Sequence, residues 1–505
     1  MKNTMMSGFF VLSVSGILCK IIGAFFRLPL TYILGVDGIG VFQLVMSVFS
    51  FVLVLASGGI SITLSKLISS ARAKREYGKI KWYIYLAVTY SVIASFLIGL
   101  LFLVMAKPLS TFQHTPDAWA AYMFFLPLLI FSSLVAFFRG IYQGYENMLP
   151  TAISQIVEQI SKFVFGLLFA FLLSKHSMEG GVLGAFLGIL AGEVLAFIYL
   201  ILQYKSINLR QIKVLNEGRK NFYLYLFPAT IGLAISSFIH FFDSVVIVNR
   251  LSKAGFAAKS AASLYGLQSG IVGALLNFPL IISMSFATTI LPKLSFNNSS
   301  SKKDKESIKN SFAYLWYILL PITFGIVAIS YPLYKFAYPF LDDILLNCAV
   351  KLTALGAVST IFFAVMQFLI SVLQSKGEFK YVTISQTIAG LLKVLCTIFL
   401  CSAPTINIYG VVIGNIVYAF GVAISCLIKL KGVGFINLDN FFAPLLSSLV
   451  MLVVVSLLSI SLKVSLLLNL VSCVVCGTVI YLILTLPIIK GFKKDFVGKK
   501  TNKEK

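Results

Sequence analysis

Polar residues interrupt an otherwise apolar segment at ISQIVEQISK, residues 153–162. Gln155, Gln159 and Lys162 follow the spacing i, i+4, i+7, which places them in one stripe on one face of a helix. Amide and ammonium groups in such a stripe can donate hydrogen bonds to an anionic ligand. Glu158 stands four residues before Lys162, the favourable order for an ion pair within a helix. The stripe is therefore a candidate binding surface, and the alternative is a Glu158–Lys162 pair that neutralises itself and binds nothing.

A second stretch, ISQTIAGLLK at residues 384–393, repeats the Ile-Ser-Gln start and the Lys end of the first. Gln386 and Lys393 are again seven residues apart and share a helix face. This copy lacks counterparts of Glu158 and Gln159. The two stretches could form facing walls of one cavity, with the polar chemistry concentrated in the first.

Ionisable residues inside apolar segments are costly, at about 2.5–3.5 kcal/mol each near a bilayer centre on insertion scales, and usually face a bundle interior or a wet cavity. Four of them here are cations at neutral pH and three are acids, so a shared cavity with partly paired or protonated acids would be net positive. A positive cavity favours an anionic substrate, whereas a site for cationic drugs would hold surplus carboxylates. Asp243 and Lys393 could also simply pair with each other. The full set is Lys20, Arg27, Glu158, Lys162, Glu193, His240, Asp243 and Lys393.

Several of these residues have an interpretation that needs no ligand. Lys20 and Arg27 share a helix face, but their long side chains could also reach the membrane surface. Glu193 could bond a neighbouring helix. His240 would more often be a satisfied interior histidine than a proton relay.

The elements that must position these residues are transmembrane helices. The chain of 505 residues is 59% hydrophobic and 11% charged, against about 25% charged residues in soluble domains. Apolar runs of 18 or more residues recur along its length, which indicates spanning helices, because the backbone must satisfy its own hydrogen bonds in lipid. We expect an all-α polytopic membrane protein. The sequence predicts about fourteen spans, at 8–34, 38–66, 82–106, 118–143, 150–174, 181–204, 221–249, 262–291, 310–334, 345–374, 379–402, 407–429, 440–462 and 464–489.

Basic residues concentrate in alternate loops. Residues 66–81, 205–220, 293–309 and 490–505 are rich in Lys and Arg and account for most of the net charge of +24. By the positive-inside rule these segments are cytoplasmic, which puts both termini on the inner side of a bacterial cytoplasmic membrane. Since they flank spans and carry no nucleic-acid motif, we expect the lipid bilayer as partner and no nucleic acid.

The offset between the two Ile-Ser-Gln stretches corresponds to six spans. It predicts two parallel six-helix lobes around a central cavity, a common transporter plan. The expected organisation is an N-terminal lobe at 1–205, a basic cytoplasmic linker at 206–220, a C-terminal lobe at 221–430, transmembrane helices 13 and 14 at 431–490, and a basic cytoplasmic tail at 491–505.

The chain lacks the motifs of several function classes. There is no G-x-x-x-x-G-K-[ST] loop for nucleotide binding and no H-E-x-x-H or similar metal-ligand cluster. The seven cysteines lie mostly within spans, which argues against a disulfide framework. We therefore expect a monomeric transporter rather than an enzyme, with no cofactor, metal or nucleotide, driven by the membrane potential or an ion gradient.

Longer stretches resemble a known family. The sequence is similar to the polysaccharide-export branch of the multidrug/oligosaccharidyl-lipid/polysaccharide superfamily, to the stage V sporulation protein B group and to its relatives, the MurJ-type lipid II flippases. The stretches that carry this resemblance are KIIGAFFRLPLTYILGVDGIGVFQL (20–44), SGGISITLSKLIS (57–69), FFRGIYQGYENMLPTAISQIVEQISK (137–162), HFFDSVVIVNRL (240–251) and SLYGLQSGIVGALLNFPLIISMSFATTILPKLS (263–295).

The resemblance implies a flippase for an undecaprenyl-pyrophosphate-linked saccharide that works by alternating access. Lys20, Arg27 and Lys162 would be its cavity cations. The family usually has arginine at the first of these, so a point charge here replaces a bidentate fork. Arg250, with Lys253 and Lys259, forms a basic outer group that would receive the pyrophosphate, close an outer gate or lie at the membrane interface.

The resemblance does not carry sodium coupling over to this chain. Relatives with a sodium site use carboxylates on spans seven and eleven, whereas span eleven here offers Lys393. Our hypothesis is that Lys393 acts as a tethered cation for Asp243. Alternatives to the flippase are a MATE-type cation-coupled drug antiporter, a membrane glycosyltransferase or polymerase, and a sporulation or division scaffold. The cargo could be lipid II, a capsule or teichoic precursor, or a spore-cortex precursor.

Overall fold

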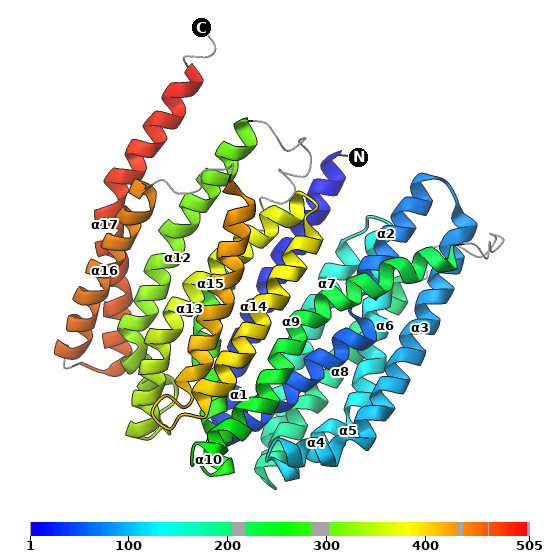
Figure 1. Cartoon of the computed structure of the whole chain (residues 1–505), viewed down its shortest axis with the longest axis horizontal. Coiled ribbons are helices and arrows are strands. Elements are labelled where there is room, and N and C mark those ends of the chain that lie inside the picture. The colour runs from blue at the N-terminus through cyan, green and yellow to red at the C-terminus, as the bar shows by residue number, and fades with distance from the viewer. Residues whose placement is uncertain are drawn as a thin grey trace. The chain divides into compact units, whose positions relative to one another are not determined.

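A computed structural model describes residues 2–204, 218–281, 283, 302–431, 438–462 and 464–501, and the regular elements in these ranges are all helices (Figure 1). Within them, 13 helical segments are long and apolar enough to cross a membrane. The first of these, Val14–Ala73, combines the first two predicted spans. The prediction of an all-α polytopic membrane protein is therefore confirmed.

Most helices follow the predicted spans, whereas α12 and α17 extend further into the flanking basic segments. Their bounds are α1 (Lys2–Ser57), α2 (Ile60–Ala73), α3 (Tyr77–Val104), α4 (Ala106–Phe112), η1 (Pro116–Ala118), α5 (Trp119–Met123), α6 (Phe125–Gly144), α7 (Leu149–Ser174), α8 (Met178–Tyr204), α9 (Arg219–Lys253), α10 (Ala258–Gly266), η2 (Leu267–Val272), α12 (Lys302–Ala337), α13 (Asp343–Ser375), α14 (Phe379–Cys401), α15 (Tyr409–Lys429), α16 (Leu438–Ser461) and α17 (Leu466–Thr501).

The start of the chain contains the two helices predicted at 8–34 and 38–66. The element α1 comprises two helices that are joined at Gly35, whose φ of 68° and ψ of −178° are non-helical. Glycine adopts this left-handed φ without a steric penalty. The next break comes at residues 58–59, before α2. The predicted break between the first two spans is thus confirmed, and it lies at Gly35.

The chain divides into two compact units. Unit 1 comprises Met1–Ile271 and Gly390–Val411, and unit 2 comprises Val272–Ala389 and Val412–Lys505. One boundary falls inside α14, between Gln386 and Lys393. The two six-helix lobes and their shared cavity stay a prediction. Most of the predicted linker, at 205–217, lies outside the described residues, as do the loop at 284–301, residues 502–505 and the side chains of 487–501.

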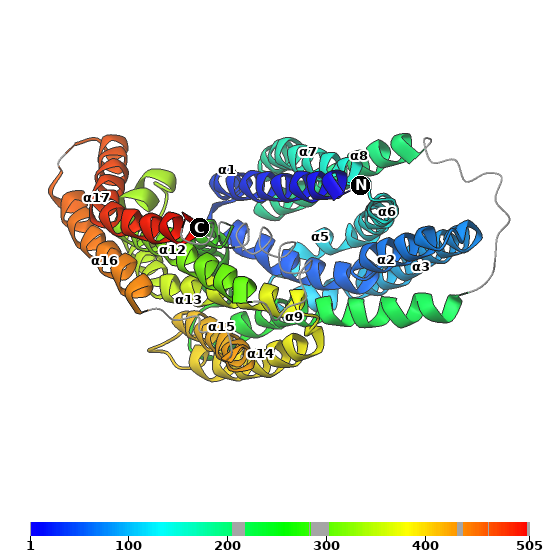
Figure 2. The same ribbon diagram turned by 90° about the horizontal axis from the view of Figure 1, so that it is seen from above.

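Close helix contacts hold α7 and α8 together in unit 1, and α1 lies alongside α7 (Figure 2). A Cβ on Gly188 would lie 2.1 Å from the Cα of Gly166, and a Cβ on Gly184 would lie 2.3 Å from the carbonyl oxygen of Phe169. Small residues are what allow helix backbones to approach this closely in membranes. The α7–α8 pair therefore forms a rigid support for the charged residues on both helices.

In unit 2, α12 packs against α13, α16 and α17. The Tyr481 hydroxyl of α17 donates a 2.7 Å hydrogen bond to the carbonyl oxygen of Tyr317, and Trp316 meets Phe441 with ring centroids 4.9 Å apart. These contacts attach α16 and α17, which correspond to the predicted helices 13 and 14, to the rest of this unit.

Candidate anion-binding site

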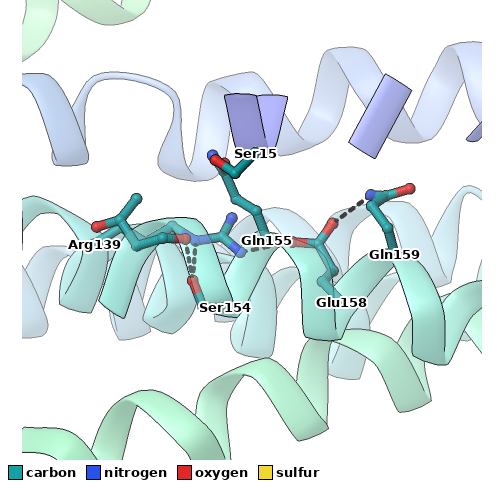
Figure 3. A network of polar contacts seen from close by, with 7 residues as sticks. Ser15, Arg139, Ser154, Gln155, Glu158 and Gln159 are labelled. Carbon is teal, nitrogen blue, oxygen red and sulfur yellow. Dashed lines mark hydrogen bonds and ion pairs between the residues drawn. The ribbon is translucent and has the colours of Figure 1, made fainter. Parts of the chain in front are cut away.

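An arginine and a glutamate join α6 to α7 at the centre of the candidate site (Figure 3). The Nη2 of Arg139 donates to Oε2 of Glu158 at 2.8 Å, and its Nε donates to the Ser154 hydroxyl at 2.9 Å. Gln159 donates from Nε2 to Oε1 of Glu158 at 3.1 Å. The Arg139 and Glu158 side chains are 16% and 19% exposed, so the pair is shielded from most of the solvent.

The predicted Glu158–Lys162 ion pair is wrong for this structure, because the Glu158 carboxylate bonds to Arg139 and Gln159 instead. Both Glu158 oxygens accept from these two donors. Lys162 forms no ion pair in the described part of the chain. Glu158 is thus paired with Arg139 of α6, whereas its spacing in the sequence had suggested a pair with Lys162.

The stripe of Gln155, Gln159 and Lys162 faces α1. The Ser15 hydroxyl of α1 donates to Oε1 of Gln155 at 3.3 Å. A Cβ on Gly23 would lie 3.7 Å from Oε1 of Gln159, so α1 passes close to this side chain. The predicted alignment of the three residues along one face of α7 is consistent with these contacts.

The cations of α1 and α7 gather near one another. The Lys162 ammonium lies 5.5 Å from the centroid of the Phe26 ring, within the range of a cation–π interaction. Arg27 follows Phe26 and is half-buried, close enough to Lys162 for their like charges to interact. Lys20, two turns earlier on α1, is exposed. A ligand with negative charge would relieve the repulsion between Arg27 and Lys162.

Glu193 of α8 is buried behind α7, with an exposed fraction of 8%. Its Oε2 has no hydrogen-bond partner among the described residues, and neither does the buried hydroxyl of Ser132 on α6. The neighbouring Gly192 brings the helices together, since a Cβ there would lie 2.8 Å from the carbonyl oxygen of Glu158. Charged neighbours of Glu193 are Glu158, Arg139 and Lys162.

A separate ion pair joins α9 to the second half of α14. The Lys393 ammonium lies 2.5 Å from Oδ2 of Asp243, and the two side chains are 2% and 8% exposed. This contact is the pairing that the sequence analysis gave as one alternative. Oδ1 of Asp243 and the hydroxyl of Thr397 are buried without a partner in the described residues. His240 lies one turn before Asp243 on α9 and interacts electrostatically with both charged groups of the pair. Any part in ion coupling stays a prediction.

Arg250, predicted to bind substrate, lies in the last turn of α9 and is half-buried. No hydrogen bond or ion pair connects it to the α6–α7 network among the described residues. Lys259 of α10 instead pairs with Asp37 of α1, with its ammonium 3.3 Å from Oδ2. The Ser263 hydroxyl donates to the other oxygen of Asp37.

A second group of contacts ties α9 to the segment after α4. The Gln113 amide donates to the Ser244 hydroxyl at 3.3 Å and its carbonyl accepts from the Tyr122 hydroxyl. The Nε2 of His114 and Oδ1 of Asn249 are 2.9 Å apart. Together with the Asp37 contacts, these bonds hold α9 and α10 to the N-terminal helices.

Sequence reasoning missed Arg139 and Asp37. Arg139 lies five residues before the end of a span, in the stretch FFRGIYQGYEN, so it resembles one of the many basic residues near inner loops. Its signal was its place within an apolar run. Asp37 follows the kink at Gly35 and resembled a loop residue.

The interior of α1 and α6–α8 has an excess of positive charge. Arg27, Arg139 and Lys162 stand against Glu158 and Glu193, and the exposed Lys20 lies two turns before Arg27. Arg139 and Glu158 neutralise each other. The remaining charge suits a compact anion that accepts several hydrogen bonds, such as a phosphate or diphosphate.

Comparisons with known proteins identify the family of the chain. The family model described as polysaccharide biosynthesis protein matches residues 5–298. The chain is 27% identical to stage V sporulation protein B of Bacillus subtilis over 306 residues, which are 58% of each protein. It is 24% identical to the lipid II flippase MurJ of the same organism over 368 residues, 67% of this chain and 66% of that protein. The chain thus matches somewhat less than two thirds of the length of these relatives.

Solved structures share the fold at low sequence identity. The lipid II flippase MurJ in an inward closed conformation has a TM-score of 0.75 and 17% identity, and the match covers 96% of this chain and 99% of that one. An inward-facing multidrug resistance MATE family transporter has a TM-score of 0.63 and 16% identity, covering 82% and 95%. These likenesses establish the fold and leave the cargo to the chemistry of the site.

Proposed function

The chain belongs to the polysaccharide biosynthesis protein family, and we propose that it is a flippase for an undecaprenyl-pyrophosphate-linked saccharide. It would move this anionic lipid from the inner to the outer leaflet of the cytoplasmic membrane by alternating access. The observation that carries the proposal is the excess of cations on facing surfaces of α1 and α7. The similarity to stage V sporulation protein B and lipid II flippase MurJ supports the same function.

In this proposal each charged group of unit 1 has a distinct task. Lys162 and Arg27 bind the pyrophosphate, because charge-assisted hydrogen bonds to phosphate oxygens are about twice as strong as neutral ones. Gln155 and Gln159 donate further hydrogen bonds along the same face. Arg139 does not touch the cargo. It holds Glu158 away from Lys162 and so keeps the lysine available for the anion.

The proposal makes the protein a transporter rather than an enzyme, with both termini in the cytoplasm. Lipid II, a capsule or teichoic precursor and a spore-cortex precursor share the pyrophosphate-lipid group, and the site recognises that group. Unit 2 contributes α16 and α17, whose apolar exposed faces suit contact with lipid chains.

Two lysines on α7 provide a matched test. Lys162 lies in the polar stripe, whereas Lys175 is the exposed C-cap residue of the same helix. Purified protein in proteoliposomes should translocate a fluorescent undecaprenyl-pyrophosphate saccharide. Lys162→Gln should lose most of this activity, while Lys175→Gln should keep it. Equal activity of the two variants would contradict the proposed site, and an inactive unsubstituted protein in every such assay would contradict the function.

Complementation then narrows the cargo. A strain depleted of its lipid II flippase should grow when it expresses this chain if lipid II is carried. Growth failure at a normal protein level would assign another pyrophosphate-linked saccharide.

A MATE-type cation-coupled drug antiporter is the second candidate, and the shared fold favours it. The surplus of cations over carboxylates in α1 and α6–α8 speaks against it, because cationic drugs need acidic partners. Efflux of ethidium from cells expressing the chain would discriminate the two. We expect none.

A further inference from the structure

Glu193 is a buried carboxyl group that the proposed transport site does not use. It is 8% exposed within the membrane-spanning α8, and its Oε2 has no hydrogen-bond partner among the described residues. An ionised carboxylate in such a place loses its hydration and leaves one oxygen without a hydrogen bond, which costs several kcal/mol. A protonated carboxyl avoids most of this cost and becomes a donor. The buried Ser132 hydroxyl, which also has no partner in the described part of the chain, is its neighbour on α6.

The charges around Glu193 come from three packed helices. Helix α7 contributes Glu158 and Lys162, α6 contributes Arg139, and α1 contributes Arg27 through its contact with Lys162. The hydrogen bonds of Arg139 go to Glu158 and Ser154. The arginine is therefore bonded to Glu158 and not to Glu193.

The short elements α5 and η1 also pack against α8. Their one charged residue is Asp117 of η1, which is exposed and is not among the charged neighbours of Glu193. Lys162 is thus the remaining counter-charge available to Glu193.

We propose that Glu193 is a proton-binding site whose occupancy controls how strongly Lys162 and its neighbours hold an anionic ligand. When Glu193 is ionised, it competes with the ligand for the charge of Lys162. When Glu193 is protonated, this competition ends and the cluster gains one positive charge. Proton binding and anion binding therefore favour each other, and the coupling is the same in both directions.

The identity of the anion rests on the proposed function, whereas the proton site does not. The two together make the transported anion enter with a proton. Such coupling would let a proton gradient contribute to transport without any metal ion.

An infrared measurement tests the proton site without a ligand. The full chain in lipid nanodiscs at neutral pH should show the C=O stretching band of a protonated carboxyl. Glu193→Gln should remove this band. The matched control is Glu179→Gln, which changes the other acidic residue of α8, in its first turn, and should leave the band in place. A wild-type spectrum without the band, or a band that persists in Glu193→Gln, would overturn the proposal.

A calorimetric titration tests the coupling. Farnesyl diphosphate serves as the probe, at a pH high enough to abolish the infrared band so that Glu193 is ionised before binding. Titrations in two buffers of different ionisation enthalpy then give the protons taken up on binding. Wild type should take up more protons than Glu193→Gln, by a difference approaching about one proton per ligand. Any change in the protonation of farnesyl diphosphate itself is the same for both proteins, so it does not contribute to the difference in proton uptake. Glu193→Asp keeps a titratable carboxyl and should restore the uptake.

The possible outcomes separate the two proposals. Binding with equal proton uptake in wild type and Glu193→Gln overturns the control of anion binding by Glu193, while the proposed function stands. If wild type does not bind the diphosphate, the proposed function is contradicted, and the infrared band alone decides whether Glu193 binds a proton. Monodisperse elution of every variant confirms that folding does not account for the differences.

Discussion

Charged side chains within membrane helices are held by specific partners, and the partner decides what each charge can do. Arg139 gives Glu158 a neutral, hydrogen-bonded environment. Lys162 lies against the Phe26 ring instead. The face of an aromatic ring attracts the ammonium group but does not neutralise its charge. The same stretch of α7 therefore holds one neutralised charge and one that remains available to a ligand.

Removing Lys393 from the buried pair with Asp243 tests the hypothesis that Lys393 is a tethered cation. Lys393→Ala would leave Asp243 buried and charged, and removing one partner of a buried pair typically costs roughly 3–5 kcal/mol. We expect a lower melting temperature that sodium partly restores, because both carboxylate oxygens of Asp243 would then lack a partner, and the unpartnered Thr397 hydroxyl belongs to the next turn of α14. Transport with and without sodium should follow the same pattern.

The double variant Lys393→Ala with Asp243→Asn serves as the control for this prediction, since it has no buried charge to compensate. Its stability should not respond to sodium, and choline in place of sodium should not stabilise any of the variants. A single variant with unchanged stability and no new sodium dependence would refute the hypothesis.

Arg139→Lys separates charge from geometry. The guanidinium bonds to Ser154 and Glu158 from two different nitrogens, whereas a lysine has one compact ammonium group. We expect transport to fall although the net charge is unchanged. A double-mutant cycle with Glu158→Gln should give a coupling energy within about 0.5–3 kcal/mol. Arg219→Lys, an exposed residue at the start of α9, is the control and should behave like wild type. Full activity of Arg139→Lys would show that the fork is dispensable.

The residue pattern predicted which side chains share a face but not which of them bond. Gln155, Gln159 and Lys162 lie along one face because helical periodicity determines it. Glu158 was matched to Lys162 by spacing within one helix, and Arg139 from α6 takes its carboxylate instead. Spacing within a helix carries no information on which other helix packs beside it.

At the scale of helices, the α7–α8 contact depends on glycine. Gly188→Ala would place a Cβ 2.1 Å from the Cα of Gly166, so the two backbones would have to separate. We expect a loss of stability of about 1–3 kcal/mol, typical of overpacking. Gly232→Ala is the control, because a Cβ added there would meet no neighbouring atom within 4 Å. Thermal unfolding in detergent measures both, and an equal effect of the two substitutions would argue against a tight α7–α8 contact.

The helices were largely predictable because each span must be long and apolar. Most of their ends follow the predicted spans within a few residues, and the break between the first two spans lies at Gly35. The exceptions are α12, which starts at Lys302 instead of 310, and α17, which runs to Thr501 instead of 489. Hydropathy marks where a helix crosses the membrane, but it does not show how far a helix continues through the polar residues beyond the bilayer.

At the scale of the whole molecule, the loop charges predict the orientation. Lys74 follows α2 and Lys253 ends α9, and both side chains are exposed. Single cysteines at these positions should react differently with a membrane-impermeant maleimide on intact cells. We expect labelling of Lys253→Cys from outside and of Lys74→Cys only after permeabilisation, relative to the unsubstituted chain. The reverse pattern would place the termini outside.

Alternating access requires contacts at the closed end to open during each cycle. In unit 1, Asp37 of α1 bonds to Lys259 and Ser263 of α10, and a Cβ on Gly40 would lie only 2.3 Å from the carbonyl oxygen of Ala262. If the proposed function holds, this contact must break before the cargo can leave. A disulfide between Asp37→Cys and Ser263→Cys would prevent that step.

We therefore expect oxidation of the double cysteine variant to abolish translocation in proteoliposomes, and a reducing agent to restore it. The single variants Asp37→Cys and Ser263→Cys, oxidised in the same way, report the effect of losing the polar contact itself and should retain activity. Asp37→Cys also loses the ion pair to Lys259, and this loss should favour opening of the α1–α10 contact. Transport by the cross-linked protein at the rate of the reduced form would show that α1 and α10 move together, and that the opening lies elsewhere in the molecule.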